Sequence, residues 1–197
     1  PSYIWGASSS AIFVTSGNDV ARFNGSTWTV EAAHSWQNLA DIWGASANDL
    51  WAVGAGGTIV HHDGSGWSDV PSWTTSSLSG VFGASANDVI AVGQSGTIRH
   101  WNGTDWNPES SASSETLEAV WMTPSGQAFA VGNSGTILFY DGSAWSVMTS
   151  GTSNNLRAVW GRSATDVYAG GWMGTLLHYD GTSWSPVDAS FGSTPIY

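Results

Sequence analysis

Short apolar runs alternate with turn-forming residues along the whole chain, and residues 39–77 show this pattern most clearly. Four runs there consist mainly of β-branched, aliphatic or aromatic residues, and Gly, Asn, Asp or Ser lie between them: Leu39–Trp43, Leu50–Val53, Thr58–His62 and Trp67–Val70. Runs of this length with such boundaries are typical of β-strands joined by hairpins. We therefore predict four short antiparallel strands in this stretch.

The same pattern recurs in five copies along the 197 residues. A tryptophan follows the last turn of each copy, always 39 residues after the previous one: Trp28, Trp67, Trp106, Trp145 and Trp184. A fixed period near 40 residues that holds four strands is the sequence signature of a β-propeller, with one blade per repeat. We predict an all-β, five-bladed β-propeller of four-stranded antiparallel blades in a single domain. The predicted blades are continuous in sequence and span residues 1–38, 39–77, 78–116, 117–155 and 156–197. The alternative architecture is a fragment of a larger ring, and this fragment would oligomerise.

Glycine and Asx residues mark the predicted turns. A Gly-x-x-Gly tetrad connects the second and third strands, and we expect its glycines to supply positive φ: the tetrads begin at Gly54, Gly93, Gly132 and Gly171. Adjacent Asp-Gly or Asn-Gly pairs, such as Asp63-Gly64, join the third and fourth strands. Three aspartates after the first strand are predicted to form turns by accepting hydrogen bonds from nearby backbone amides: Asp49, Asp88 and Asp166.

The charge balance of the chain narrows the classes of partner. Fifteen acidic residues face four arginines and no lysine, which gives a net charge of −11. Nucleic acids and anionic lipids both require clustered cations, so we expect neither partner. No cysteine is present, which excludes disulfides and thiolate metal sites. No run of apolar residues is long enough for a membrane span, and no signal-peptide pattern opens the chain.

These features predict a monomeric, mature or excised soluble form without membrane insertion. The abundance of Trp, Gly, Ser, Thr and Asn with few charges resembles the composition of secreted bacterial repeat proteins. We therefore expect an extracellular or cell-surface location.

The repeat motifs resemble those of a known group of propellers. WGASANDLWAVG, GTIVHHDG and the closing Trp67 together resemble the bacterial propeller repeats related to Asp-box (sialidase-type) proteins and to photosystem assembly-factor propellers. An Asp-box has one residue between its Asp and Gly, whereas Asp63 and Gly64 are adjacent here. Sialidase activity would also require three of the four arginines to converge, and we do not expect it. The likeness to lectins concerns architecture and tryptophan content, and no lectin motif is present.

The 14 tryptophans fall into different classes. Nine recur at equivalent positions and are predicted to fill the space between sheets: the five closing residues with Trp5, Trp43, Trp121 and Trp160. Trp51 and Trp101 also align with large apolar or aromatic residues in the other copies and are assigned to packing. Three remain: Trp36 and Trp73 lie between blades, and Trp172 lies inside the last tetrad.

Antiparallel blades bring the linkers and the second-to-third hairpins to one end. The three remaining tryptophans should therefore emerge on one face, together with Gln94, Ser95, Asn133 and Ser134. Exposed rings beside amides and hydroxyls suit neutral sugars, so the leading hypothesis is a non-enzymatic, multivalent, lectin-like carbohydrate-binding module. The alternative is a protein-interaction or scaffold propeller that uses the same aromatic face.

Catalytic and metal-binding constellations are weakly represented. Equivalent histidines on third strands, His61, His100 and His178, lie too far from a propeller axis to share a metal ion. A glycoside hydrolase would need paired carboxylates, and the best candidates, Asp41 and Glu118, should point to opposite faces of their strands. We therefore predict no enzyme activity, no metal and no cofactor.

Overall fold

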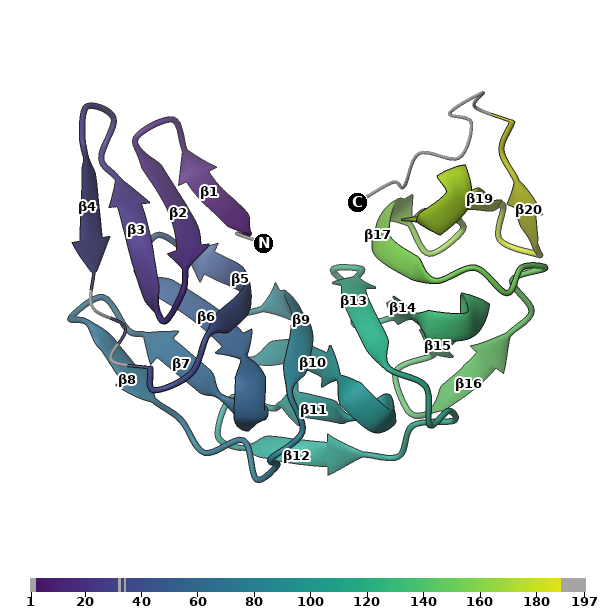
Figure 1. Cartoon of the computed structure of the whole chain (residues 1–197), viewed down its shortest axis with the longest axis horizontal. Coiled ribbons are helices and arrows are strands. Elements are labelled where there is room, and N and C mark those ends of the chain that lie inside the picture. The colour runs from purple at the N-terminus through teal and green to yellow at the C-terminus, as the bar shows by residue number, and fades with distance from the viewer. Residues whose placement is uncertain (1–2, 32, 34, 189–197) are drawn as a thin grey trace. The chain divides into compact units, whose positions relative to one another are not determined.

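The computed structural model describes residues 3–31, 33 and 35–188, and these form an all-β structure (Figure 1). Its first three sheets contain the following strands: β1 (Ile4–Ser8), β2 (Ala11–Ser16), β3 (Asp19–Phe23) and β4 (Trp28–Glu31); β5 (Leu39–Ser46), β6 (Asp49–Gly54), β7 (Ile59–His62) and β8 (Trp67–Asp69); β9 (Leu78–Ser85), β10 (Asp88–Gly93), β11 (Ile98–Trp101) and β12 (Trp106–Glu109). The last two contain β13 (Leu117–Met122), β14 (Ala128–Gly132), β15 (Ile137–Tyr140) and β16 (Trp145–Met148), followed by β17 (Leu156–Ser163), β18 (Asp166–Gly171), β19 (Leu176–Tyr179) and β20 (Trp184–Pro186).

Each sheet is built from four strands that are consecutive in sequence. In the second sheet, for example, Trp43 of β5 is paired with Trp51 of β6, which is paired in turn with His61 of β7. The predicted fold class and the continuity of each blade are therefore confirmed for the described residues. Positions 1–2 and 189–197, at the ends of the first and last predicted blades, lie outside them.

Contacts divide the chain into two compact units. The first unit comprises Pro1–Ala91 and Arg99–Pro108, and the second comprises Val92–Ile98 and Glu109–Tyr197. The assignment of the chain to a single domain stays a prediction. No helix in the described ranges has the length and apolar character needed to cross a membrane.

The predicted strands agree with the observed ones to within a few residues, and the largest difference lies at the first strand. β5 continues to Ser46 instead of ending at Trp43, so only Ala47 and Asn48 separate it from β6. Between the second and third strands lies a short 3-10 turn in four of the sheets: η1 (Ala55–Gly57), η2 (Gln94–Gly96), η3 (Asn133–Gly135) and η4 (Trp172–Gly174).

Two physical effects require glycine in the tetrads: the positive φ that was predicted, and the close approach of a neighbouring linker. Gly54 is extended, with φ −170°, and not in the left-handed region. A Cβ there would lie 2.2 Å from the carbonyl oxygen of Asn38, so close approach of the preceding linker requires glycine. Gly57 has φ 77°, and its Cβ would also meet the carbonyl oxygen of Thr74 at 2.0 Å. The 3-10 turn therefore packs directly against the linkers before and after its sheet.

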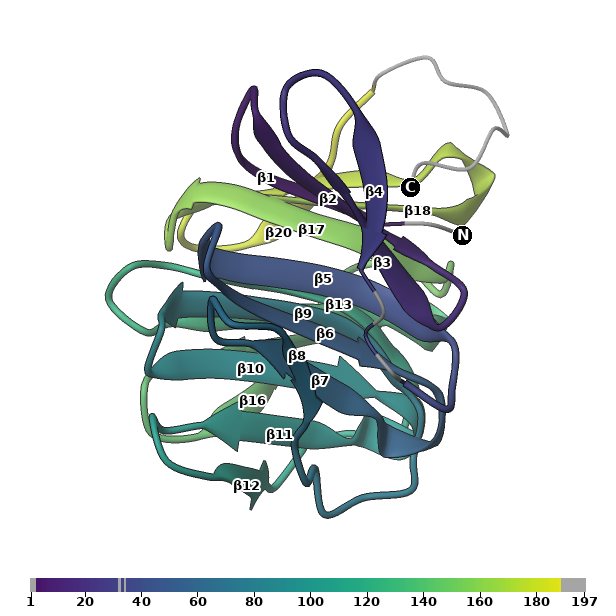
Figure 2. The same cartoon turned by 90° about the vertical axis from the view of Figure 1, so that its left-hand side faces the viewer.

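Within each unit the core lies between successive sheets, and their first strands lie side by side, as β5 and β9 do in the first unit (Figure 2). In the first unit, buried residues of β5 and β6 pack with those of β9 and β10, including Val53, Leu78 and Val89. The ring of Trp43 lies so close to Gly83 that a Cβ there would be 2.5 Å away. In the second unit, Trp121 lies against Gly161 in the same way. The aromatic residue of one first strand thus fits over a glycine of the next, which confirms the predicted packing role at these positions.

Candidate functional site

Three tryptophans at the linker end of the sheets are exposed. Trp36, Trp73 and Trp172 have 91%, 73% and 45% of their surface accessible, whereas the closing residues Trp106, Trp145 and Trp184 are buried. Within each unit, linkers and 3-10 turns lie together at one end: η1 packs against Thr74, and the amide of Trp172 donates to the carbonyl oxygen of Asn155 at 2.9 Å. The linker end of each unit therefore carries exposed tryptophan side chains, Trp36 and Trp73 in the first unit and Trp172 in the second.

Trp73 and its neighbours form the first cluster at this end, which we call the Trp73 cluster (Ser72, Trp73, Thr74, Thr75 and Arg99). Residues 72–75 line a shallow, open depression. The amide of Thr74 donates to the Ser72 hydroxyl at 3.4 Å, and Arg99 Nη2 donates to the Trp73 carbonyl oxygen at 2.8 Å. Burial lowers the pKa of Arg99 below its ordinary range, but the guanidinium remains charged at neutral pH. The cluster thus combines an indole, hydroxyl groups and a cation.

Trp172 belongs to a second cluster, in the other unit, which we call the Trp172 cluster (Glu118, Arg157, Trp172 and Met173). The guanidinium of Arg157 lies over the indole of Trp172, 5.3 Å from the ring centroid. Its Nη1 forms an ion pair with Glu118 Oε2 at 2.7 Å, while its buried Nε has no hydrogen-bond partner. Met173 is exposed and has φ 55°. This cluster is amphipathic and locally neutral in charge.

The amide and hydroxyl residues selected from sequence lie in η2 and η3. The side chains of Gln94, Ser95 and Ser134 are exposed, whereas the Oδ1 of Asn133 is buried and has no hydrogen-bond partner. Ser134 uses its main chain to join two sheets, because its amide donates to Asn155 Oδ1 at 3.0 Å.

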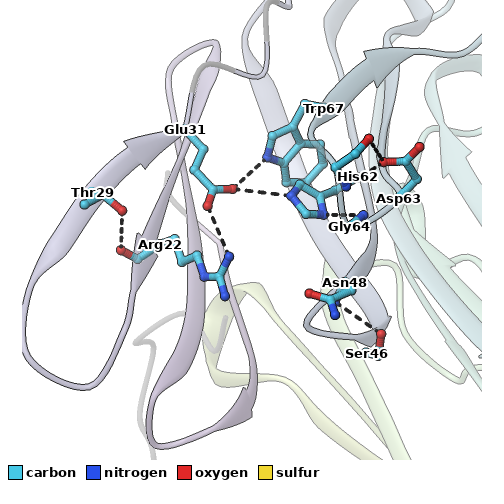
Figure 3. A network of polar contacts seen from close by, with 10 residues as sticks. Arg22, Thr29, Glu31, Ser46, Asn48, His62, Asp63, Gly64 and Trp67 are labelled. Atoms are coloured by element: carbon cyan, nitrogen blue, oxygen red, sulfur yellow. Dashed lines mark hydrogen bonds and ion pairs between the residues drawn. The ribbon is translucent and has the colours of Figure 1, made fainter.

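A polar network between the first two sheets was not singled out from the sequence (Figure 3). Glu31 accepts a hydrogen bond from Trp67 Nε1 at 3.2 Å, and Arg22 Nη1 lies 3.5 Å from its other oxygen. The amide of Gly64 donates to His62 Nδ1, so Nε2 carries the proton of the neutral ring and faces Glu31 at 3.8 Å. Together with Ser65 and Gly66, these residues line a small cavity.

The sequence signal for this network is a glutamate 36 residues before a closing tryptophan. Glu109 and Trp145 repeat the pairing in the second unit. Val70 and Met148 occupy the same repeat position, and there the indole N–H of Trp106 has no hydrogen-bond partner while that of Trp184 donates to sulfur. This hydrogen bond between the closing tryptophan and the preceding sheet is therefore present in some repeats and absent in others.

Asp49, Asp88 and Asp166 were predicted to accept hydrogen bonds from nearby backbone amides, but their carboxylates bind side chains of the third strands. Each carboxylate instead receives Nε2 of the equivalent third-strand histidine: His61 at 2.8 Å, His100 at 2.6 Å and His178 at 2.8 Å. Contacts with His178 and Arg162 lower the pKa of Asp166. The Asx-Gly turns behave as expected, with Asp141 Oδ1 accepting from the amides of Ser143 and Ala144. These contacts lower the pKa of Asp141.

The two candidate catalytic carboxylates each form polar contacts with neighbouring parts of the protein. Asp41 accepts the amide of Ile42 on one oxygen and that of Val81, on the next first strand, on the other, both at 2.8 Å. Burial raises the pKa of Asp41 to about 7, although the two backbone hydrogen bonds oppose this shift. Glu118 pairs with Arg157 in the other unit. Among the described residues, no group of three or more His, Asp or Glu side chains is placed to hold a metal ion.

No protein-family model matches the chain, and no curated protein matches its sequence. Solved structures do match: YCF48 bound to D1 peptide has a TM-score of 0.76 at 16% identity, over 99% of this chain and 69% of that one. YCF48 from Cyanidioschyzon merolae has a TM-score of 0.73 at 16% identity, over 98% of this chain and 74% of that one. The WD40 repeats of RRP9 have a TM-score of 0.75 at 12% identity, over 93% and 61%.

These matches confirm the resemblance to photosystem assembly-factor propellers at the level of the fold. They show the same arrangement of repeated four-stranded sheets that the chain presents at intervals of about 39 residues. The chain is therefore a β-propeller of five four-stranded blades.

Proposed function

We propose that this propeller is a non-enzymatic binding module whose partner is a polypeptide, held at the linker end of the sheets. The observation that carries the proposal is the exposure of Trp36, Trp73 and Trp172 at that end, while most repeated tryptophans are buried. Large exposed indoles are characteristic anchors of protein interfaces, because each buries much apolar surface with few rotamers to restrict.

The structural comparison favours a polypeptide as the partner. One of the matching propellers is YCF48 in a complex with D1 peptide. Its low identity gives no residue correspondence, so the binding residues proposed here come from this chain alone.

A neutral glycan is the second candidate. The exposed ring of Trp73 beside the hydroxyls of Ser72, Thr74 and Thr75 has the combination of apolar and polar groups that a sugar ring needs. This reading carries with it the extracellular or cell-surface location expected from composition. It lacks a matching propeller of known glycan-binding function among the structures compared above.

One comparison of two proteins tests both candidate partners. The parent chain and a variant with Trp36→Ser, Trp73→Gly and Trp172→Ser would be screened against a phage library of random twelve-residue peptides and an array of neutral glycans. We expect the parent, but not the variant, to enrich peptides, with no glycan bound above background. Thermal melts of both proteins exclude unfolding as the cause. Glycan binding without peptide enrichment, or equal enrichment by the two proteins, would refute the proposal.

A further inference from the structure

Trp73 occupies a backbone position that suits glycine. Its φ of 57° is in the left-handed region, which residues with a side chain seldom adopt. The fourth repeat has the same linker turn: Ser150 receives the amide of Thr152 just as Ser72 receives that of Thr74. The residue between them in the fourth repeat is Gly151, with φ 75°. The backbone conformation at residue 73 is therefore one that glycine adopts without strain, and the second linker has tryptophan there.

The main chain around Trp73 is held from two sides while its side chain faces solvent. Arg99 Nη2 binds the Trp73 carbonyl oxygen, and the Thr74 carbonyl lies against Gly57 of η1. Because 73% of the Trp73 surface is accessible, burial of the indole does little to offset the unfavourable backbone conformation. Folding thus gives no reason for tryptophan at this position, which points to a role in contact with another molecule.

Arg99 adds a charge to this surface. Arg22, Arg157 and Arg162 each form an ion pair with a carboxylate. In the part of the chain that the structure describes, Arg99 has no carboxylate partner, and its Nε has no hydrogen-bond partner. An arginine left without an acid in a chain with 15 acidic residues offers charge complementarity to a carboxylate from outside.

We propose that Trp73 and Arg99 form an anchor for a peptide segment in which an Asp or Glu lies next to an apolar residue. The apolar side chain packs on the indole, and the carboxylate pairs with the guanidinium. The exposed Thr75 lines the same depression, and its hydroxyl lies beside Trp73 to bind the peptide main chain. This assignment rests on the proposed function, since it names the chemistry of the polypeptide partner.

The experiment uses the full chain and the random twelve-residue peptide library. Peptides enriched by the parent are sequenced, and the strongest is synthesised in its native form and with each Asp or Glu replaced by Asn or Gln. Its affinity is measured for the parent, Trp73→Gly, Arg99→Gln and Trp172→Ser. Arg99→Gln keeps a polar side chain at this position but removes the charge, and Trp73→Gly places the residue of the fourth linker, Gly151, in the second linker.

We expect enriched peptides to contain an acidic residue beside an apolar one. Trp73→Gly and Arg99→Gln should each weaken binding at least tenfold. Replacing the peptide's Asp or Glu by Asn or Gln should weaken binding to the parent but not to Arg99→Gln. Trp73→Gly should melt within a few degrees of the parent, or at a higher temperature. If the enriched peptides lack acids, or bind Trp73→Gly as tightly as the parent, this anchor is refuted while peptide binding stands. If the parent enriches no peptide, both this anchor and the proposed function fail.

Discussion

The closing tryptophans and the linker tryptophans are the same side chain in two opposite environments. Trp145 is buried on a fourth strand, and its indole N–H donates to Glu109 of the preceding sheet. Trp73 lies in a linker with its indole in solvent and its backbone in a conformation suited to glycine. The first residue recurs in all copies and the second does not. Recurrence therefore marks tryptophans that join sheets, and single occurrence marks those available for contact.

Two repeated tryptophans depart from this division. Trp28 and Trp160 are 51% and 58% exposed, although both align with buried residues. They belong to the first and last copies, each of which has a neighbouring sheet on one side within its own unit. A repeat position thus buries its indole only where an adjacent sheet covers it.

The largest expected effect is loss of a sheet-joining tryptophan. Trp145→Ala should lower the free energy of unfolding by about 3–5 kcal/mol, as other buried aromatic truncations do. Trp172→Ala should cost less than about 1 kcal/mol, because it removes only an exposed cation–π contact with Arg157. Chemical denaturation of the two variants gives the comparison. Similar losses in both would mean that the two classes of tryptophan do not differ in role.

A somewhat smaller effect is expected for the carboxyl group between β5 and β9. Burial raises the pKa of Asp41 from 3.8 to about 7, so the folded protein holds this proton after the unfolded chain has lost it. The corresponding stability is fully present below pH 4 and is lost as the pH rises toward and through 7. Asp41→Ala, which matches the native Ala119 and Ala158 at the same repeat position, removes this dependence.

The measurement is urea unfolding at pH 4.5 and pH 7.5. The stability of Asp41→Ala relative to the parent should rise by about 3 kcal/mol between the two pH values. Asp69 is an exposed strand carboxylate and supplies the control: the relative stability of Asp69→Ala should change by less than about 0.5 kcal/mol. If the difference in stability between Asp41→Ala and the parent is the same at both pH values, the raised pKa of Asp41 is contradicted.

The indole hydrogen bonds between sheets should have an intermediate effect. Glu109→Val copies the native Val70 position and leaves the Trp145 N–H unpaired, at a cost of about 1–3 kcal/mol. The reciprocal change, Val70→Glu, supplies an acceptor for the unpaired N–H of Trp106 and should recover about 1 kcal/mol. Thermal melts of both variants test the pair. We expect the two changes in stability to have opposite signs. Destabilisation by Val70→Glu would show that the packing of Val70 contributes more to stability than the missing hydrogen bond would.

The smallest effect is expected at Trp73. Trp73→Gly relieves an unfavourable backbone conformation by about 1 kcal/mol and adds a similar entropic cost in the unfolded chain. The melting temperature should therefore remain within a few degrees of the parent value, or rise. Trp36→Gly is the matched comparison, since Trp36 is exposed but has no positive φ. It should be the less stable variant of the two.

The features that depend on neighbours in the chain could be predicted from the amino-acid pattern. The apolar runs, the Asx-Gly turns and the 39-residue interval between closing tryptophans predicted the strands, the hairpins and the repeated sheets. The grouping of linkers with second-to-third hairpins also followed, because antiparallel connectivity dictates which loops share an end. These predictions needed only local periodicity and its repetition.

Contacts between residues about 12 to 40 positions apart could not be predicted in this way, because they depend on three-dimensional packing. The pairing of Asp49 with His61, the bond from Val81 to Asp41 and the network around Glu31 depend on how strands and sheets pack. The same holds for Gly54, which is glycine because a neighbouring carbonyl leaves no room for a Cβ. The left-handed backbone of Trp73 could not be predicted from the sequence either. The same is true of Arg99, which has no carboxylate partner among the described residues. Periodicity names the residues on each strand, but burial and polar partners are set by the side chains that other sheets and linkers bring against them.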